Sequence, residues 1–519
     1  ELYIKPVSEI YTQSTEVKRM VVIMSVLAFA LLFVAAMNYI LNSVSSLPIR
    51  ARSVGVHKCN GASSKDIFNM FLFETAALFV VALVCMALLL FAFREYVADM
   101  VAVPTLGTLL NAQTIWLPAI MILAIFILSA LLPARLFSVI PVTQVFRVST
   151  SGKQGWKRSL LFIQFGGIAF VITLLVIVLL QYDRLMNNDL GYDPENIVYA
   201  PLNNMDDQKA AKLTAEFKKL PYVTATGLSS MDILSGYGGF PILDNEKNWL
   251  FTARQVNYDA DYLSLMKIPL LEGQPLKGDG DILVNESFVS KRGWTDAAIG
   301  KYIYDDEGNL KGKIVGVTRD FMVNSFFTPQ LPVIMFGSDR MSYCNFTVRV
   351  SELTPEYLRE MNDKIAELFP NEDVGFTVLK TIIESQYEGT RHFRDGVFVA
   401  SIAILLITLM GLLGYITDEM HRRSKEIAIR KVNGATAPNI LRLLSKDVLI
   451  TAFPAILLGV IASRVVGESW LRQFADKIPL TVFIFISTAL LVLAIIWGCV
   501  ILKSWNIANE NPVRSIKNE

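Results

Sequence analysis

The sequence is poor in the residue types and motifs that most often carry chemistry. Only four of its 519 residues are cysteine, and only three are histidine. No histidine, neither His57, His392 nor His421, has a second one at the spacing of a metal site. The phosphate-binding pattern G-x-x-x-x-G-K-[ST] is absent, and the nearest stretch, Gly308–Ile314, has the wrong spacing. We therefore predict no catalytic residue, no metal site, no cofactor and no ATPase site in this chain.

Charged residues are scarce as well. They make up 18% of the chain, whereas 53% of the residues are hydrophobic and the mean hydropathy is +0.44. This composition is too apolar for an ordinary soluble protein of this length. The net charge of +1 gives no reason to expect nucleic acid as a partner. Membrane lipid is the expected surrounding of much of the chain.

Seven long apolar stretches are present. A bilayer core about 30 Å thick needs roughly 20 apolar residues of helix. Ionisable residues are almost absent from these stretches, which disfavours an ion-coupled carrier, and Asn38, Gln164 and the Gly166-Gly167 pair are predicted to be helix-packing contacts. The seven predicted spans are Val21–Leu41, Thr75–Phe93, Ile115–Leu132, Leu160–Leu180, Val397–Ile416, Val448–Val466 and Leu480–Leu502.

The basic residues predict the orientation of the spans. They gather after the first span, between the third and fourth, and after the fifth, so the positive-inside rule places these loops in the cytoplasm. The polar segment Asp183–Asp395 then lies outside, as do residues 1–19. Because the chain opens outside the membrane without a signal sequence, we expect a further span and a further outer domain upstream of Glu1. The four cysteines are placed so that no intrachain disulfide is expected.

An internal repeat links the two halves of the membrane part. The stretch "EIAIRKVNGAT" (residues 426–436) returns as "SVGVHKCNGAS" (residues 53–63), at a shift of 373 residues. Each copy contains a span, this basic insert, two more spans and a tail with Pro-Val. The sequence therefore predicts two copies of one membrane module.

The residues of the insert predict its local structure. Glu426 and Arg430 are four residues apart, the spacing of a helical ion pair. Asn433-Gly434 follows as a left-handed stop, which makes the insert a short helix with a tight corner. Two interpretations stay open: an interfacial helix whose bases reach lipid headgroups, or a docking element for a cytoplasmic partner. The repeat favours docking, because two similar elements suit a two-fold symmetric partner.

The outer segment is predicted to be mixed α and β. "NFTVRV" and "GFTVLK" alternate apolar and polar residues like strands, and Thr354-Pro355 is a helix start. No acid pair, nucleophile or metal cluster stands out. A binding or force-receiving role is therefore expected for this domain.

Two stretches resemble a known family. "RRSKEIAIRKVNGAT" resembles the cytoplasmic signature of FtsX-like, MacB-type permeases of ABC transporters, and "DILVNESFVSKRGW" with "KGKIVGVTRDFMVNSFFTPQLPVIMF" is similar to their periplasmic core domain. The resemblance implies an α-helical membrane protein with an α+β extracytoplasmic domain and two FtsX-like membrane modules. The implied domains are the end of a first periplasmic domain (residues 1–19), a first membrane module (20–150), a leading span (151–182), a periplasmic core domain (183–395) and a second membrane module (396–519).

The resemblance also implies a function. Such permeases work with a separate cytoplasmic ATPase dimer, whose closure moves the periplasmic domains, a scheme called mechanotransmission. The implied location is the bacterial inner membrane, with a periplasmic adaptor and an outer-membrane factor as further partners, and the implied role is export or extraction of a peptide, lipid-like or drug-like substrate. The alternative is a signalling or scaffold permease that activates a cell-wall enzyme or senses antimicrobial peptides.

Twelve residues are expected to couple the chain to the ATPase. In the first insert Ser53 replaces the acid and His57 replaces Arg430, so the two copies are not expected to bind equally. The expected residues are Arg423, Glu426, Ile429, Arg430, Lys431, Asn433 and Gly434 in the second copy, and Arg50, His57, Lys58, Asn60 and Gly61 in the first.

Overall fold

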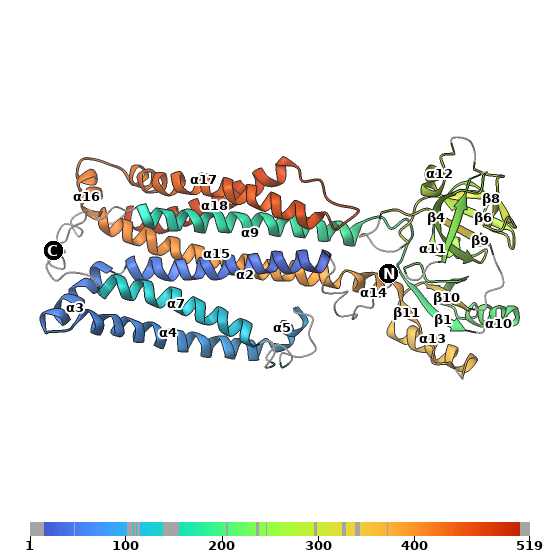
Figure 1. The fold of residues 1–519 in the computed structure, drawn as a ribbon, viewed down its shortest axis with the longest axis horizontal. Coiled ribbons are helices and arrows are strands. Elements are labelled where there is room, and N and C mark those ends of the chain that lie inside the picture. Colours follow the sequence, from blue (N-terminus) through green and yellow to red (C-terminus); the bar gives the residue numbers. More distant parts are fainter. Residues whose placement is uncertain are drawn as a thin grey trace. The chain divides into compact units, whose positions relative to one another are not determined.

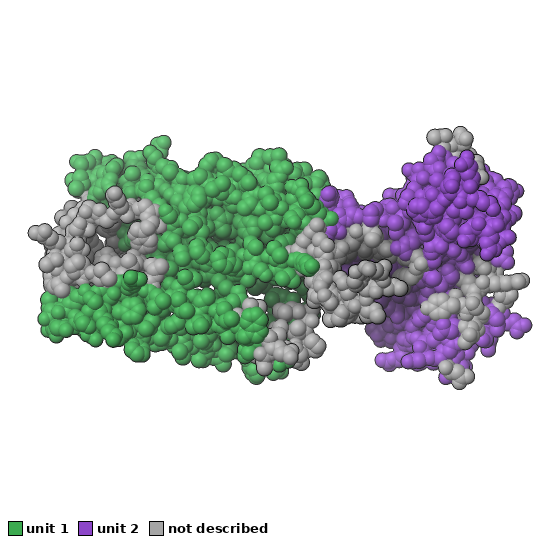
Figure 2. Space-filling view, in the orientation of Figure 1, with its two compact units in different colours: residues 1–182, 390–472, 478–519 green, residues 183–389, 473–477 purple. Residues whose placement is uncertain are grey.

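The chain divides into two compact units, which Figure 2 colours green and purple. Unit 1 comprises residues 1–182, 390–472 and 478–519, and unit 2 comprises residues 183–389 and 473–477. The computed structural model describes residues 15–45, 47–100, 107, 111, 115–138, 155–203, 206–234, 238–244, 246–294, 298–323, 329–337, 343–370 and 372–508.

Unit 1 is built from helices. Seven of the described helices are long and apolar enough to cross a membrane, in agreement with the seven predicted stretches. Figure 1 shows these long helices side by side, with the short helices α3 and α16 at the same end of the unit. The helices are α2 (Thr15–Ser45), α3 (Leu47–Cys59), α4 (Ser64–Ala92), α5 (Arg94–Met100), α7 (Trp116–Ser138), α9 (Gly155–Asn187), α15 (Glu388–Arg422), α16 (Ser424–Val432), α17 (Ala437–Leu471) and α18 (Val482–Ala508), of which α9 and α15 extend past the boundary with unit 2.

The helices pack through small residues. A methyl group on Gly411 would lie 2.5 Å from Oδ1 of Asn38, and one on Gly166 would lie 3.3 Å from the carbonyl oxygen of Ala455. Gln164 is fully buried. These contacts confirm the predicted packing role of Asn38, Gln164 and the glycine pair. Large apolar side chains face outward elsewhere, such as Phe73 on α4 at 74% exposure, as expected of a lipid-facing surface.

Unit 2 contains one mixed sheet with short helices against it. The strand order is β11-β1-β10-β2-β4-β9-β6-β8-β5, with β3 paired to β4 and β7 paired to β8. The β4·β9 and β6·β8 pairs are parallel, and the other pairs are antiparallel. The strands are β1 (Ile197–Asn203), β2 (Val223–Ser229), β3 (Gly238–Leu243), β4 (Trp249–Tyr258), β5 (Leu270–Gly273), β6 (Asp281–Asn285), β7 (Tyr302–Tyr304), β8 (Leu310–Thr318), β9 (Val333–Gly337), β10 (Tyr343–Val350) and β11 (Thr377–Val378).

The sheet carries two separate cores. One core includes Phe217, Phe346 and Met361, where α10 (Asp207–Phe217) and α13 (Pro355–Leu368) cover β1, β10 and β2. The other includes Phe288 and Ile334, where α12 (Glu286–Arg292) covers β6 and β9. Helices α11 (Tyr262–Met266) and α14 (Leu379–Gln386) complete the unit.

Two elements of unit 2 were predicted from the sequence, a helix that starts at Thr354 and a strand in "GFTVLK". Thr354 caps α13 by accepting a hydrogen bond from the Tyr357 backbone N–H, which confirms the predicted helix start. The strand predicted from "GFTVLK" is largely wrong. Only Thr377 and Val378 pair in β11, because α14 begins at Leu379 and buries that residue on one helical face.

Candidate functional site

Helix α16 ends in a tight, hydrogen-bonded corner. Gly434 has a φ of +89°, and its N–H donates to the carbonyl of Lys431 at 3.0 Å. The N–H of Ala435 donates to the carbonyl of Arg430 at 2.9 Å. These two bonds form a Schellman motif, which needs a left-handed residue such as glycine just after the helix. The predicted Asn-Gly stop is confirmed.

The first copy of the repeat makes the same corner. Gly61 has a φ of +93°, and the N–H groups of Gly61 and Ala62 donate to the carbonyls of Lys58 and His57 at 3.1 and 3.0 Å. A capping box begins the next helix, with Ser63 and Asp66 bonding each other reciprocally. The repeat therefore extends from residue types to individual hydrogen bonds.

Both short helices bury one side and expose apolar residues on the other. In α16, Ile427 is buried, whereas Ile429 is 60% and Val432 is 70% exposed. In α3, Val54 is buried and Val56, the residue aligned with Ile429, is 54% exposed. The exposed Glu426 and Arg430 pair at 2.7 Å, as their spacing predicts. Each corner thus presents a mixed apolar and polar surface.

Arg423, between α15 and α16, is turned inward. Its guanidinium contacts Glu419 at 2.5 Å and Asp447 of α17 at 2.6 Å, and its side chain is 18% exposed. Burial opposes the charge, but the two carboxylates outweigh it and raise the pKa of Arg423 above its ordinary value. We call Arg423, Glu419 and Asp447 the arginine bracket. It fixes the start of α16 to both neighbouring long helices.

Helix α9 contributes two further bases next to the bracket. Lys157 contacts Asp418 at 2.6 Å, and Arg158 lies 3.7 Å from Asp447. Three bases and three acids therefore balance in one cluster, which suits partly buried charges. We call the bracket together with Lys157, Arg158 and Asp418 the charge cluster.

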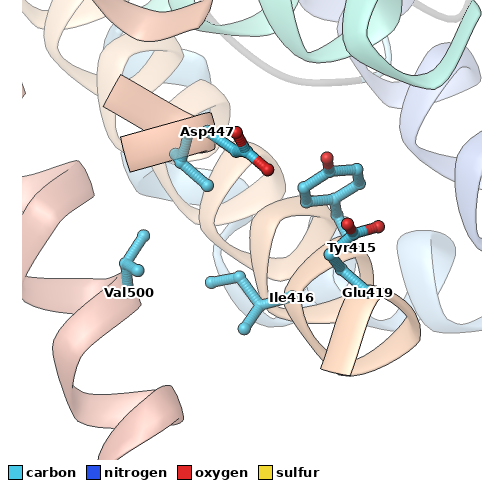
Figure 3. Close-up of a pocket in the computed structure, with 6 residues that line it drawn as sticks. Tyr415, Ile416, Glu419, Asp447 and Val500 are labelled. Carbon is cyan, nitrogen blue, oxygen red and sulfur yellow. The ribbon is translucent and has the colours of Figure 1, made fainter. Parts of the chain in front are cut away.

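A small cavity adjoins the bracket, as Figure 3 shows. Tyr415 and the carboxylates of Glu419 and Asp447 form its polar side, and Ile416 and Val500 lie below them in the view. Its volume is about 10 Å³, at the lower limit for one water molecule. This cavity is too small for a substrate.

The twelve predicted coupling residues fall into different surroundings. Lys431 and Lys58 are half-buried, and Lys58 donates to the carbonyl of Ser138 at 2.8 Å. Arg423 belongs to the bracket, and the side chain of Arg50 in α3 lies outside the described residues. The exposed members are Glu426, Ile429, Arg430, Asn433, Gly434, His57, Asn60 and Gly61.

The sequence analysis identified only Arg423 among the members of the charge cluster. It missed Lys157, Arg158, Asp418, Glu419 and Asp447. One available signal was the repeat itself. The shift that aligns Arg423 with Arg50 also aligns Asp447 with Glu74, so both copies keep a base and an acid at the same separation. Among the residues that the structure describes, no group of three or more His, Cys, Asp or Glu side chains could hold a metal ion.

Comparison with known proteins identifies the membrane modules. The model of the FtsX-like permease C-terminal family matches residues 25–142 and 398–512. These two regions lie within the two predicted modules and contain both corners. No curated protein sequence matches the chain.

Three solved structures are similar to part of the chain. The periplasmic region of MacB from Actinobacillus actinomycetemcomitans matches at 13% identity and a TM-score of 0.29, covering 39% of this chain and 97% of that one. A domain of a putative permease from Porphyromonas gingivalis matches at 15% identity and a TM-score of 0.27, covering 36% and 90%. The extracellular domain of the noncanonic ABC-type transporter YknZ from Gram-positive bacteria matches at 10% identity and a TM-score of 0.26, covering 35% and 99%.

The family match agrees with the internal repeat and with the seven apolar helices. The chain carries two copies of the FtsX-like permease C-terminal domain in one polypeptide, and its seven membrane-capable helices agree with a multi-pass ABC transporter permease.

Proposed function

We propose that this permease carries movement from a separate cytoplasmic ATPase dimer to its extracytoplasmic unit, by mechanotransmission. The proposed location is the bacterial inner membrane. The proposed outcome is export or extraction of a peptide, lipid-like or drug-like substrate, in company with a periplasmic adaptor and an outer-membrane factor.

The arginine bracket is the observation that carries the proposal. A push on α16 can reach a long helix only if the joint between them resists bending. Arg423 sits at that joint and holds a carboxylate on α15 and one on α17 at 2.5 and 2.6 Å. Charge-assisted contacts of this length are among the strongest non-covalent links in proteins. A movement of α16 therefore has to move α15 and α17 with it.

The length of α15 supports the same role. The helix runs without interruption over 35 residues, about 52 Å at 1.5 Å per residue. It begins at Glu388, directly after the last helix of unit 2, and ends at the bracket. In this proposal α15 carries the movement from the bracket toward unit 2, because the helix is continuous between the bracket and the boundary with that unit.

The exposed faces of α3 and α16 are the proposed ATPase contacts. Each offers an apolar residue, Val56 or Ile429, beside polar groups and a rigid Asn-Gly corner. Two such faces at one end of unit 1 suit the two halves of an ATPase dimer (Figure 1). The second face carries the guanidinium of Arg430, whereas the first face has the imidazole of His57 at the aligned position.

The test separates docking from transmission. The full chain is purified with its ATPase in lipid nanodiscs, and hydrogen exchange in unit 2 is compared with ATP and with ADP. Arg430→Glu should weaken ATPase co-purification in a salt-dependent way, and His57→Glu, its matched control, should weaken it less. Arg423→Gln should keep the ATPase bound but abolish the ATP-dependent change in unit 2, and Arg423→Lys should restore part of it.

The outcomes distinguish the alternatives. Full ATPase association of Arg430→Glu would show that α16 is an interfacial anchor. An unchanged ATP response of Arg423→Gln would remove the bracket from the coupling route. If ATP changes unit 2 in the wild type but no peptide, lipid or drug stimulates hydrolysis or crosses in proteoliposomes, the signalling alternative takes the place of transport.

A further inference from the structure

An open groove lies along the cytoplasmic half of α17 and α18, with a volume of about 1150 Å³. Three bases, Arg430, Arg442 and Lys446, line it toward the start of α17. Farther along, its wall is apolar and includes Leu449, Phe453 and, from α18, Trp497. No acidic residue is among those that line the groove.

We propose that this groove binds one anionic phospholipid of the cytoplasmic leaflet, with the phosphate on Arg442 and Lys446 and an acyl chain along Phe453 and Trp497. The proposal goes beyond the coupling function and does not depend on it.

The position of the bases along α17 fits a headgroup. The helical segment Pro438–Leu471 contains 34 residues, about 51 Å, whereas a bilayer core is about 30 Å thick. The first turns of α17 therefore reach into the headgroup region. From Lys446 to Phe453 the helix rises by about 10 Å, which places the aromatic and aliphatic side chains at acyl-chain depth when the bases lie at the phosphates.

The charges of the groove favour an anion over a zwitterion. Arg430 already pairs with Glu426 at 2.7 Å. Arg442 and Lys446 form no ion pair with any of the residues that the structure describes. Bases near the membrane surface attract anionic lipid, and basic pockets between membrane helices bind its headgroups.

The first module does not have these bases at the two aligned positions. At the repeat shift, Arg442 aligns with Asn69 and Lys446 with Phe73. The alignment is supported by burial, because Ile67 and Ile440 occupy matching positions and are both 1% exposed. The bases are thus an addition to the second module and not a property that the repeat imposes on both.

The test uses Trp497 as the reporter inside the groove. The full chain is placed in nanodiscs of phosphatidylcholine with a minor fraction of brominated phosphatidylglycerol or, separately, brominated phosphatidylcholine. Quenching of the Trp497 signal is obtained as the difference between wild type and Trp497→Phe. We expect the brominated anionic lipid to quench this signal far more strongly than the zwitterionic one at equal mole fraction.

Removing the two bases should abolish that preference. The double variant Arg442→Gln, Lys446→Gln should bind the anionic lipid on the order of ten- to thirty-fold more weakly, as expected for two bases at a membrane surface. Lys65→Gln, on the exposed start of α4, is the matched control and should leave quenching unchanged. Equal quenching by both lipids in the wild type, or an unchanged preference in the double variant, overturns the proposal.

A different occupant would give a different result. If the double variant loses ATPase co-purification in nanodiscs that contain only phosphatidylcholine, the bases serve the ATPase and the lipid proposal is wrong. Retained ATPase binding together with loss of anionic-lipid preference supports it. This pattern also stays distinct from failure of the coupling proposal, which is read from Arg430 and Arg423.

Discussion

At the residue scale, the backbone conformation of Gly434 predicts the effect of substituting this residue. Its φ of +89° is strained for a residue with a side chain, while the space around a Cβ is open, with no atom within 4 Å. Gly434→Ala should therefore destabilise the corner by about 1 kcal/mol, purely through the backbone. Gly434→Asn should cost less, because asparagine tolerates the left-handed region.

The two Gly434 variants are compared by hydrogen exchange of the backbone amides at positions 434 and 435 and by ATPase co-purification. Alanine should raise exchange and lower co-purification more than asparagine does. Equal behaviour of alanine and asparagine would mean that the positive φ is not what holds the corner.

Asp259 in unit 2 is a second residue with a predictable effect, because its pKa links the stability of the unit to pH. Burial raises its pKa to about 6 from an ordinary 3.8, although the Leu228 N–H donates to its carboxylate at 2.7 Å and opposes the shift. The folded state therefore favours the protonated form. Its contribution to the free energy of unfolding is greatest below about pH 3.8 and falls as the pH rises to about 6, above which it is constant.

Asp259→Asn should remove this pH dependence and stabilise unit 2 at pH 8 by up to about 3 kcal/mol. The measurement is hydrogen exchange of β2 and β4 in the full chain, corrected for the intrinsic rate at each pH. The variant should exchange more slowly than the wild type at pH 8 and equally at pH 4. A wild-type stability of these strands that is flat between pH 4 and 7 would contradict the assignment.

At the scale of elements, the contact between α9 and α15 can be tested by exchanging charges. Lys157 and Asp418 are each about one-fifth exposed and lie 2.6 Å apart. Removing either partner leaves a partly buried charge, which costs about 1–3 kcal/mol. Lys157→Asp and Asp418→Lys should each lower the melting temperature of the purified chain, and the double exchange should restore most of it. Additive losses in the double exchange would show that the two side chains do not interact.

At the scale of the whole molecule, the expected orientation places α16 in the cytoplasm and unit 2 outside the membrane. A cysteine at Val432, exposed on α16, should react only with reagents that enter the cytoplasm. A cysteine at Asp306, exposed in unit 2, should react with an impermeant maleimide in intact cells. Both variants are made with Cys59, Cys85, Cys344 and Cys499 replaced. Labelling of both positions from the same side would refute the orientation of the seven spans.

Features governed by short stretches of chain could be predicted from the sequence. The seven apolar helices depend on length and hydropathy, and the corner at Gly434 depends on one residue type and two bonds to carbonyls of the preceding helical turn. The Ser63–Asp66 capping box joins residues three apart. These interactions are local, so the residues that make them are visible side by side in the sequence.

The tertiary structure decided what depends on residues far apart in the chain. The sequence marked Arg423 as a surface coupling residue, yet it lies against Asp447, 24 residues away, and shares a cluster with Lys157 of α9. The burial of Asp259 likewise follows from how β2, β4 and α11 meet. A charged residue at a helix end has the same sequence signature whether it faces water or a carboxylate, because its surroundings are set by helices that pack from distant segments. Hydropathy and local bonds thus determined the spans and the corners, and only packing determined which bases hold the joint and which line the groove.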